Sequence, residues 1–273
     1  MNPADASRGR LGTTFDGASD LYQRARPEYP EALIDHLVEV AHVKSGSRLL
    51  EVGCATGKAT LPLARRGFHI TCIEPGPALA AAAAARRNLA GFDAEVVQAR
   101  FEDWDPAGQL YDLVFAATAW HWVNPTVGYH KAAEALVPEG HLAIWGATHV
   151  IPYEGDTFFV DIQPVYDEIG EGLPPGTPLP RPGELKDQRD EIEASGLFEV
   201  LDVTQCDWET VYDTGGYLDL LNTFSGHIAM EERRSGAAWG LLVRIFGVLI
   251  LRPLPALRPA VGRGSETGKP RGR

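Results

Sequence analysis

Short apolar runs alternate with helical patterns through most of the chain. Between residues 31 and 41 the apolar positions recur with the 3.6-residue period of a helix that buries one face. The runs at 48–52 and 111–116 are mostly apolar, which is typical of strands buried on both faces. These patterns predict helices over 19–26, 31–41, 58–66, 78–89, 128–136 and 216–223, and strands over 48–52, 69–73, 95–99, 111–116, 140–145 and 198–212.

The order of these elements predicts the fold class. Strands that alternate with helices at this spacing form a doubly wound, Rossmann-like α/β fold, whose mostly parallel sheet carries helices on both faces. Ligands of such sheets bind beyond the carboxyl ends of the strands. We therefore expect the loops that start at Gly53, Glu74, Arg100 and Ala117 to converge on one cleft.

The ends of the chain differ from this central part. Residues 1–14 and 252–273 lack an apolar period, and the second segment is rich in proline, glycine and arginine. Both segments are predicted to be disordered. The tail 252–273 is also basic, with six basic residues and one acid, whereas the whole chain has a net charge of −12. A proline-rich connector over 174–182 cannot hold a regular helix.

Composition narrows the class of function. An acidic surface argues against binding to nucleic acid, and the three cysteines are too few and scattered for a disulfide framework. No set of histidine, cysteine and carboxylate residues has the spacing of a metal site, so no metal is expected. The best candidate for a membrane span, 237–251, contains Arg244 and is shorter than the roughly 20 apolar residues that a span needs. We expect a soluble, cytoplasmic monomer or homodimer that acts on a small molecule.

A glycine-containing loop after the first predicted strand gives the strongest chemical signal. The loop runs Glu51-Val-Gly-Cys-Ala-Thr-Gly57, and Glu74 follows the next strand. Its two glycines permit close approach of a ligand, and an acid about 20 residues after such a loop suits a ligand with a ribose. A dinucleotide-binding loop would need a glycine where Ala55 stands. The loop therefore favours a nucleoside ligand without a pyrophosphate.

The two acids indicate which nucleoside binds. Glu51 is an unusual residue for the end of an apolar strand, and its carboxylate can hold an ammonium group directly or through water. Glu74 can accept hydrogen bonds from both hydroxyl groups of a ribose. S-adenosylmethionine carries an ammonium, a carboxylate and a ribose but no phosphate. We therefore expect it as the cofactor, with S-adenosylhomocysteine as the product.

The chain resembles the class I S-adenosylmethionine-dependent methyltransferases well from about Phe15 to Trp145, and more weakly to about Glu231. The match rests on the glycine loop, Glu74-Pro75, Arg100-Phe-Glu102, the segment Tyr111–Trp122 and the turn Leu136–Leu142. Ala55 stands where the family more often has a glycine, and the loop after the third strand flanks the adenine in this family. The resemblance implies cofactor contacts by Tyr22, Arg26, Glu51, Val52, Gly53, Cys54, Ala55, Thr56, Gly57, Glu74, Pro75, Phe101, Glu102, Ala117, Thr118 and Ala119.

Two segments narrow the branch of the family. The segment Phe15–Tyr22 with Arg26-Pro-Glu-Tyr-Pro30 is similar to the N-terminal lid of the type 11 small-molecule group. Ala119-Trp-His-Trp122 is similar to a loop of trans-aconitate methyltransferase-like proteins. The resemblance implies a lid over 15–45, a cofactor-binding core over 46–150, and a substrate-side insertion with the C-terminal part of the fold over 151–251. It also implies a substrate pocket that includes Phe15, Trp120, His121 and Trp122.

These features predict methyl transfer to a small molecule, with a carboxylate or hydroxyl oxygen as the favoured acceptor. His121 is the candidate general base, although a carboxylate acceptor would need none. Substrate contacts are expected from 151–181 and 218–230, where the resemblance is weakest. Two alternatives stay open: a non-catalytic protein that binds the cofactor or its product, and an NAD-type oxidoreductase, which Ala55 opposes.

The sequence leaves open which residues supply the last strand of the sheet. Proteins of this family usually finish with a strand that returns antiparallel into the sheet. Residues 241–251 are apolar but do not alternate, and a tail rich in proline and arginine is not expected to supply a central strand. Either 248–251 fills this position or the sheet is one strand short.

Overall fold

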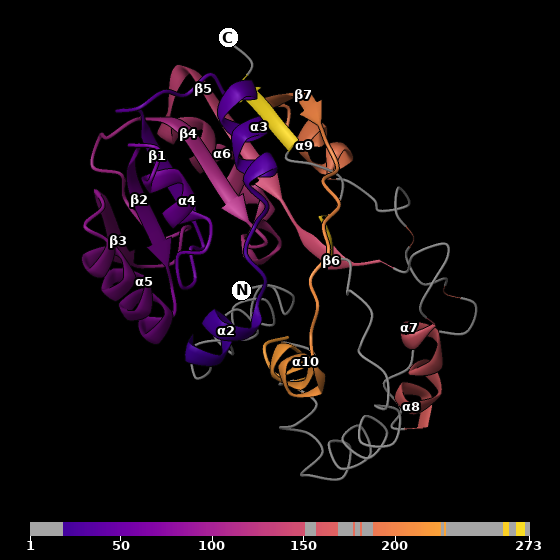
Figure 1. Cartoon of the computed structure of the whole chain (residues 1–273). Coiled ribbons are helices and arrows are strands. Elements are labelled where there is room, and N and C mark those ends of the chain that lie inside the picture. The colour runs from indigo at the N-terminus through magenta and orange to yellow at the C-terminus, as the bar shows by residue number, and fades with distance from the viewer. Residues whose placement is uncertain are drawn as a thin grey trace.

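The computed structural model describes residues 19–150, 157–168, 177, 181, 188–224, 227, 259–261 and 266–270. A seven-stranded sheet with the order β3-β2-β1-β4-β5-β9-β7 forms the centre (Figure 1). The strands from β3 to β5 are parallel, and β9 runs antiparallel to both β5 and β7. The predicted doubly wound, mostly parallel α/β class is confirmed. The strand bounds are β1 Arg48–Val52, β2 His69–Glu74, β3 Ala94–Gln98, β4 Tyr111–Ala117, β5 Leu136–Trp145, β7 Phe198–Val203 and β9 Glu266–Pro270.

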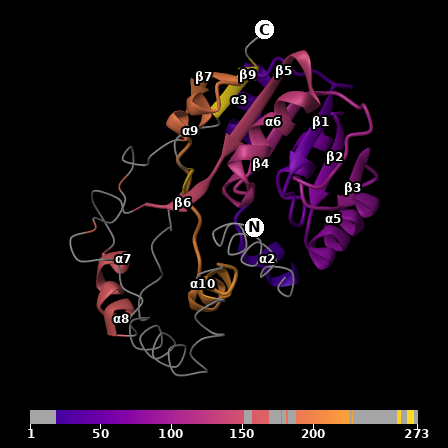
Figure 2. The same cartoon turned by 180° about the vertical axis from the view of Figure 1, so that it is seen from behind.

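Two hydrophobic cores cover the two faces of the sheet. In β1, Leu49 packs in the first core and Leu50 in the second, because successive side chains of a strand point to opposite faces. Buried residues of α3 (Glu31–Val40), α4 (Thr60–Ala64) and α5 (Pro77–Ala90) belong to the first core. Buried residues of α6 (Pro125–Ala135) and α9 (Arg189–Ala194) belong to the second, and Figure 2 shows α6 against β4 from that side.

A third apolar cluster lies beyond the carboxyl ends of the strands and is called the cap here. It joins α2 (Ser19–Ala25), α7 (Phe158–Asp161), α8 (Gln163–Glu168) and α10 (Thr214–Leu221) through Ala25, Ile162, Val165, Tyr217, Leu220 and Leu221. In Figure 1, α2 and α10 lie side by side below the end of β4. The helix α2 therefore lies beyond the carboxyl ends of the strands, where ligands of this fold class bind.

The prediction that the basic tail cannot supply a central strand is wrong. The disorder predicted over 252–273 is contradicted at 259–261 and 266–270, and the other residues of the tail lie outside the described part of the chain. Within that tail, β9 lies between β5 and β7, with Leu142 opposite Gly268 and Val200 opposite the same residue. A second short strand, β8 (Pro259–Val261), pairs with β6 (Ala147–His149). The proline of β9 is its last residue, Pro270, where a missing N–H interrupts the hydrogen-bond ladder least.

Most other elements agree with the sequence patterns to within a few residues. The helix predicted over 58–66 is shorter, since α4 spans Thr60–Ala64, and the strand predicted over 198–212 ends at Val203. The patterns missed α7, α8, α9, β6 and the 3-10 turn η2 (Trp120–Trp122), which are too short to show a period. The predictions for 1–14, Phe15 and 241–251 lie outside the described residues.

Candidate functional site

Two adjoining cavities open at the carboxyl ends of β1, β2 and β4. The main cavity has a volume of about 390 Å³, and the second has about 50 Å³. Both are lined by Tyr22, Arg26, Gly53, Ala55 and Thr118, so the two cavities meet between the glycine loop and α2. The loops predicted to converge do so here, because Gly53, Glu74, Arg100 and Ala117 all line the main cavity.

The glycine loop is held against the end of β2 by hydrogen bonds. Glu74 is 4% exposed, and its carboxylate accepts hydrogen bonds from the N–H groups of Ala55 at 2.8 Å and Gly76 at 2.9 Å. The backbone turns sharply here, with positive φ at Gly53 (72°) and at Ala55 (47°). A Cβ at Gly53 would stand 2.6 Å from the Cβ of Ala119, so the glycine is required by a neighbouring loop as well as by the turn.

Glu51 lies at the second cavity and is almost fully buried, at 1% exposure. The hydroxyl of Thr60 donates a hydrogen bond to its carboxylate at 2.5 Å. Burial raises the pKa of Glu51 to about 8, partly offset by this hydrogen bond. A cation placed in the second cavity would favour the ionised carboxylate, because opposite charges at short range lower a carboxyl pKa.

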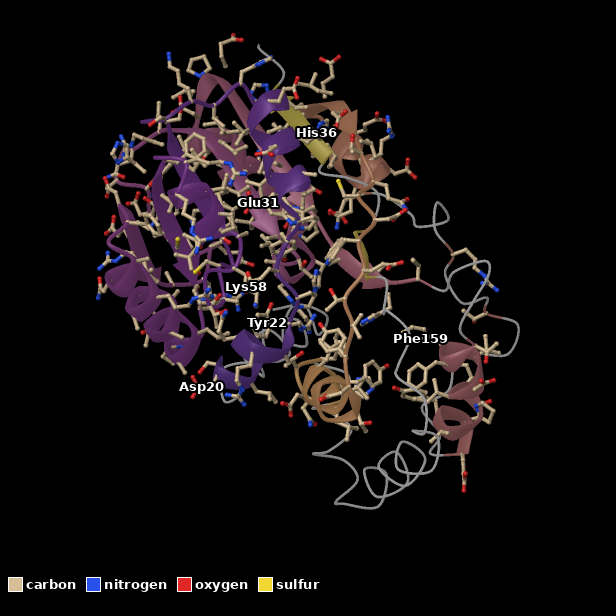
Figure 3. All side chains as sticks on the ribbon, in the orientation of Figure 1. Asp20, Tyr22, Glu31, His36, Lys58 and Phe159 are labelled. Carbon is tan, nitrogen blue, oxygen red and sulfur yellow. The ribbon has the colours of Figure 1, made fainter. Side chains whose placement is uncertain are left out.

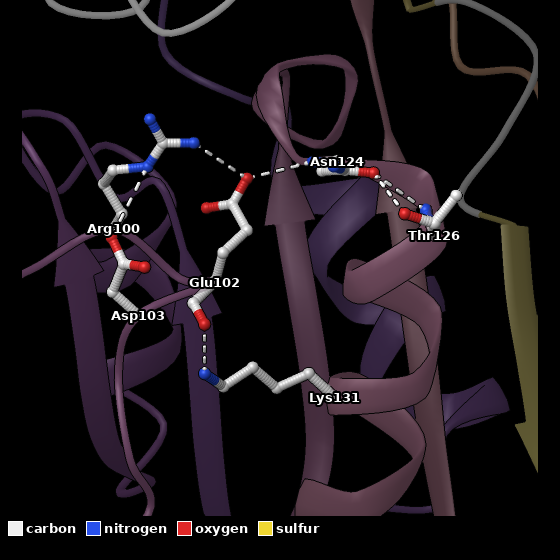
Figure 4. Close-up of polar contacts among 6 residues, drawn as sticks. All are labelled: Arg100, Glu102, Asp103, Asn124, Thr126 and Lys131. Atoms are coloured by element: carbon white, nitrogen blue, oxygen red, sulfur yellow. Dashed lines mark hydrogen bonds and ion pairs between the residues drawn. The ribbon is translucent and has the colours of Figure 1, made fainter. Parts of the chain in front are cut away.

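The loop after β3 is fixed to the start of α6 by a polar network (Figure 4). The Glu102 carboxylate accepts hydrogen bonds from the backbone N–H of Asn124 at 3.0 Å and from Arg100 at 3.3 Å. Lys131 donates to the Glu102 carbonyl at 2.7 Å, and the Asn124 side chain caps α6. The predicted residues Phe101 and Glu102 line the main cavity, with Pro75, Val52, Ala117 and Ala119.

Tyr22 and Arg26, predicted to belong to a lid, line both cavities. Arg26 donates to the Thr223 hydroxyl at 2.7 Å and to its carbonyl at 2.8 Å, and its guanidinium stacks 4.1 Å from the Phe224 ring centroid. Burial lowers the pKa of Arg26. In Figure 3, Tyr22 is labelled on α2, and Lys58 is labelled between α2 and the sheet. These contacts join α2 to the segment after α10.

Thr56 and Gly57 of the glycine loop line neither cavity. The Thr56 hydroxyl is buried and donates to the Gln23 side chain of α2 at 2.6 Å, and Arg86 of α5 donates to the same side chain. Thr56 therefore attaches α2 to the loop instead of facing the ligand space. Cys54 lines the second cavity and is also buried in the first core, as expected of a small apolar side chain.

The three aromatic residues of η2 separate in space. His121 and Trp122 line the main cavity, with ring centroids 4.5 Å apart, and desolvation lowers the pKa of His121. The expectation that Trp120 belongs to the substrate pocket is wrong, because its ring is buried in the second core against Phe101 and Tyr129. The tight turn of η2 points this side chain towards Gly128, where the missing Cβ leaves room for it. Phe15 lies outside the described residues.

The sequence patterns missed several residues of the two cavities. The expected stretch 218–230 does supply Leu220 and Phe224. Others follow β5 or precede α10 and carry no periodic signal: Ala147, Thr148, His149 and Trp208. Tyr29, which donates or accepts a hydrogen bond with Thr118 at 3.0 Å, could have been found, because it lies in the same Arg26–Pro30 segment as Arg26.

Comparison with known proteins shows which proteins this chain resembles. Residues 49–140 match the family of methyltransferase domains. An uncharacterized methyltransferase of Mycobacterium tuberculosis (strain H37Rv) is 33% identical over 142 residues, which cover 50% of this chain and 54% of the relative. The Saccharomyces cerevisiae protein CRG1, named a probable S-adenosylmethionine-dependent methyltransferase, is 28% identical over 138 residues, with coverages of 50% and 46%. The chain thus spans about half the length of these curated relatives.

A solved structure extends the likeness to the fold. The protein from Anaeromyxobacter dehalogenans that was assigned as a type II methyltransferase has a TM-score of 0.63 and 19% identity, and the match covers 89% of this chain and 97% of the other. In the part of this chain that the structure describes, no helix has the length and apolar character needed to cross a membrane. The narrower assignment to the type 11 or trans-aconitate methyltransferase-like branch stays a prediction. Residues 49–140 therefore match a methyltransferase domain, and the fold is shared with a solved structure that was assigned as a methyltransferase.

Proposed function

We propose that this chain transfers the methyl group of S-adenosylmethionine to a small-molecule acceptor, most favourably to a carboxylate or hydroxyl oxygen. The main support is the pair of buried carboxylates at the two joined cavities, Glu74 beside the main one and Glu51 beside the second. A ligand that extends through both cavities must offer hydrogen-bond donors to one acid and a cation to the other. S-adenosylmethionine offers its ribose hydroxyls and its ammonium group.

The remaining cavity walls fit the same cofactor. The main cavity is within the roughly 300–1,000 Å³ of typical ligand pockets. Its apolar residues Ile73, Leu79 and Phe101 suit the faces of an adenine, and the Glu102 loop suits the edge. At the second cavity, Arg26 suits the carboxylate of the methionine part. Two backbone N–H groups orient the Glu74 carboxylate, which as an ion can accept about four hydrogen bonds.

Positioning and exclusion of water are the main tasks left to the protein. When bound, S-adenosylmethionine supplies a sulfonium whose methyl group is already electrophilic. Tyr22 and Trp122 present aromatic faces to the main cavity, and such faces favour a cation by about 1 kcal/mol. A carboxylate acceptor is ionised and needs no base, whereas for a hydroxyl acceptor the neutral imidazole of His121 is the candidate base.

Calorimetric titration of the purified chain with S-adenosylmethionine, S-adenosylhomocysteine and NAD tests the cofactor. We expect the first two ligands to bind and NAD not to bind, because the loop has no room for a pyrophosphate next to Ala55. Binding of NAD without S-adenosylhomocysteine would overturn the proposal in favour of an oxidoreductase.

Release of S-adenosylhomocysteine tests turnover. The chain is incubated with S-adenosylmethionine and a panel of carboxylates, phenols, alcohols and amines. We expect release to depend on an oxygen-bearing acceptor, and His121→Ala to slow only the hydroxyl acceptors. Tight binding of the cofactor without release for any class would favour the non-catalytic binding protein instead.

A further inference from the structure

Two polar side chains at the second cavity lack hydrogen-bond partners. His149 of β6 and Trp208, which precedes α10, both line this cavity. No group in the described part of the chain hydrogen-bonds to the His149 imidazole, and the buried Nε1–H of Trp208 has no partner there either. Buried polar groups are nearly always paired in folded proteins, so the unpaired Nε1–H of Trp208, at the same cavity as the half-buried His149 imidazole that makes no hydrogen bond in the described residues, points to a missing ligand.

The chemistry of these groups limits what can bind. An indole N–H only donates a hydrogen bond, and a neutral imidazole can donate one and accept one. Burial, with a smaller effect from Arg26 and His227, lowers the pKa of His149 to about 4, so the ring is neutral near pH 7. The ligand must therefore present a hydrogen-bond acceptor. A carboxylate or hydroxyl oxygen meets this requirement, whereas an ammonium group has no acceptor to offer.

The surroundings of His149 favour a ligand with an apolar body. Its ring lies 5.5 Å from the Phe224 ring centroid and 5.7 Å from that of Phe159, the α7 residue labelled in Figure 3. Leu220 also lines the second cavity.

The position of these residues in the chain separates them from the cofactor. The match to the methyltransferase-domain family ends at residue 140, and His149, Trp208, Leu220 and Phe224 all lie beyond it. Residues shared across such a family serve the methyl donor that its members have in common. Residues beyond the C-terminal end of the shared region are a natural source of contacts to the acceptor, whereas Tyr22 and Arg26, which precede it, are those proposed for the cofactor.

We propose that His149 and Trp208 form the acceptor-binding end of the cleft, where both hydrogen-bond to a carboxylate or hydroxyl oxygen of an apolar methyl acceptor. The inference rests on the proposed methyl transfer and narrows its substrate class.

The test titrates the protein saturated with S-adenosylhomocysteine with three probes of similar shape: phenylacetate, benzyl alcohol and phenethylamine. We expect phenylacetate or benzyl alcohol to bind and phenethylamine not to bind. His149→Leu and Trp208→Phe should each weaken the oxygen-bearing probe tenfold or more and leave the affinity for S-adenosylhomocysteine within twofold. His149→Asn, which can still donate and accept, should keep most of the affinity. His130→Leu on α6, outside both cavities, is the matched control and should change neither affinity.

Three results would overturn the inference. One is the absence of binding by both oxygen-bearing probes, and another is binding of phenethylamine as tight as that of phenylacetate. The third is a tenfold loss of S-adenosylhomocysteine affinity in the His149 and Trp208 variants, because the oxygen held there would then be the cofactor's own carboxylate. Failure of the wild-type chain to bind S-adenosylhomocysteine is seen before any probe is added. That result contradicts the proposed function itself, and the inference falls with it.

Discussion

Two groups of residues line the cleft, and they are held in different ways. One group lies within 49–140, and the other lies beyond Trp145. Glu74, Ala55 and Glu102 are fixed by backbone hydrogen bonds at the ends of parallel strands. His149 and Phe224 make ring contacts within and beside the cap, and the backbone of His149 also pairs with β8. Backbone geometry is shared by many sequences, whereas side-chain packing is particular to one. We therefore expect the proposed cofactor side to tolerate fewer changes than the proposed acceptor side.

The largest expected difference in cofactor affinity between the two sides comes from a change at Glu74. Glu74→Gln should lower the affinity for S-adenosylhomocysteine at least a hundredfold, because each lost charge-assisted hydrogen bond costs about 1.5–3 kcal/mol. The matched change on the acceptor side, Trp208→Phe, should alter the same affinity by less than twofold. Both are measured by calorimetry, with Glu95→Gln, an exposed acid on β3, as a control. Similar losses at Glu74 and Trp208 would remove the distinction between the two sides.

Gly53 tests how rigid the cofactor side is. Gly53→Ala should destabilise the fold by about 3 kcal/mol, because the new Cβ adds overpacking against Ala119 to the strain of a positive φ. Gly91→Ala is a matched control with a φ of 69° and nothing within 4 Å of its Cβ, and it should cost only about 1 kcal/mol. Urea unfolding measures both changes. Equal losses would mean that the contact with Ala119 yields at little cost.

The protonation of Glu51 should couple cofactor binding to pH. Its folded-state pKa of about 8 is above the ordinary value of 4.5, so the native state retains a proton that the unfolded state releases. Stability of the ligand-free protein should therefore fall as pH rises from about 4.5 to about 8. Affinity for S-adenosylhomocysteine should rise over the upper part of that window, by up to about tenfold per pH unit.

Glu51→Gln separates this effect from other titrations. The variant should lose both trends when calorimetry and urea unfolding are repeated at pH 6.5 and 7.5. Retention of the full pH dependence of binding in Glu51→Gln would exclude Glu51 as the partner of the ammonium group.

The smallest expected effect concerns Ala55, where this chain departs from the family pattern. A non-glycine residue at a φ of 47° carries about 1–2 kcal/mol of strain. Glycine would remove this strain, but its greater freedom in the unfolded state would offset part of the gain. Ala55→Gly should therefore stabilise the fold by about 0.5 kcal/mol. A loss of stability in urea unfolding would indicate that the methyl group makes a packing contribution larger than its backbone cost.

The convergence of the loops on the cleft, where we propose that the cofactor binds, could be predicted from sequence because its signals are local. The strand before Glu51, the spacing to Glu74 and the loops after β3 and β4 each lie within a few residues of one another or at a fixed distance along the chain. Thr56 shows the limit of this reasoning, since its place in the loop did not reveal that its hydroxyl points to Gln23 on another helix.

The acceptor side could not be predicted in the same way. Trp208 and His149 are far apart in sequence, and only the arrangement of β6 and the cap brings them to one cavity. Trp120 was assigned to the pocket from its neighbours His121 and Trp122, but a 3-10 turn sends adjacent side chains in different directions. The strand β9 was missed because its residues have low strand propensity, and pairing on both edges overrides that propensity.

The place of β9 in the sheet has a consequence for biosynthesis. Of the described strands it is the last to leave the ribosome, yet it lies between β5 and β7, which are made earlier. Until residues 266–270 emerge, β7 has no neighbour through which to join the sheet, and the edge of β5 is open to other chains. In the nascent protein the proposed cofactor side can therefore form while the sheet beside it is still unfinished, and the open edge of β5 is prone to aggregation until residues 266–270 pair with it.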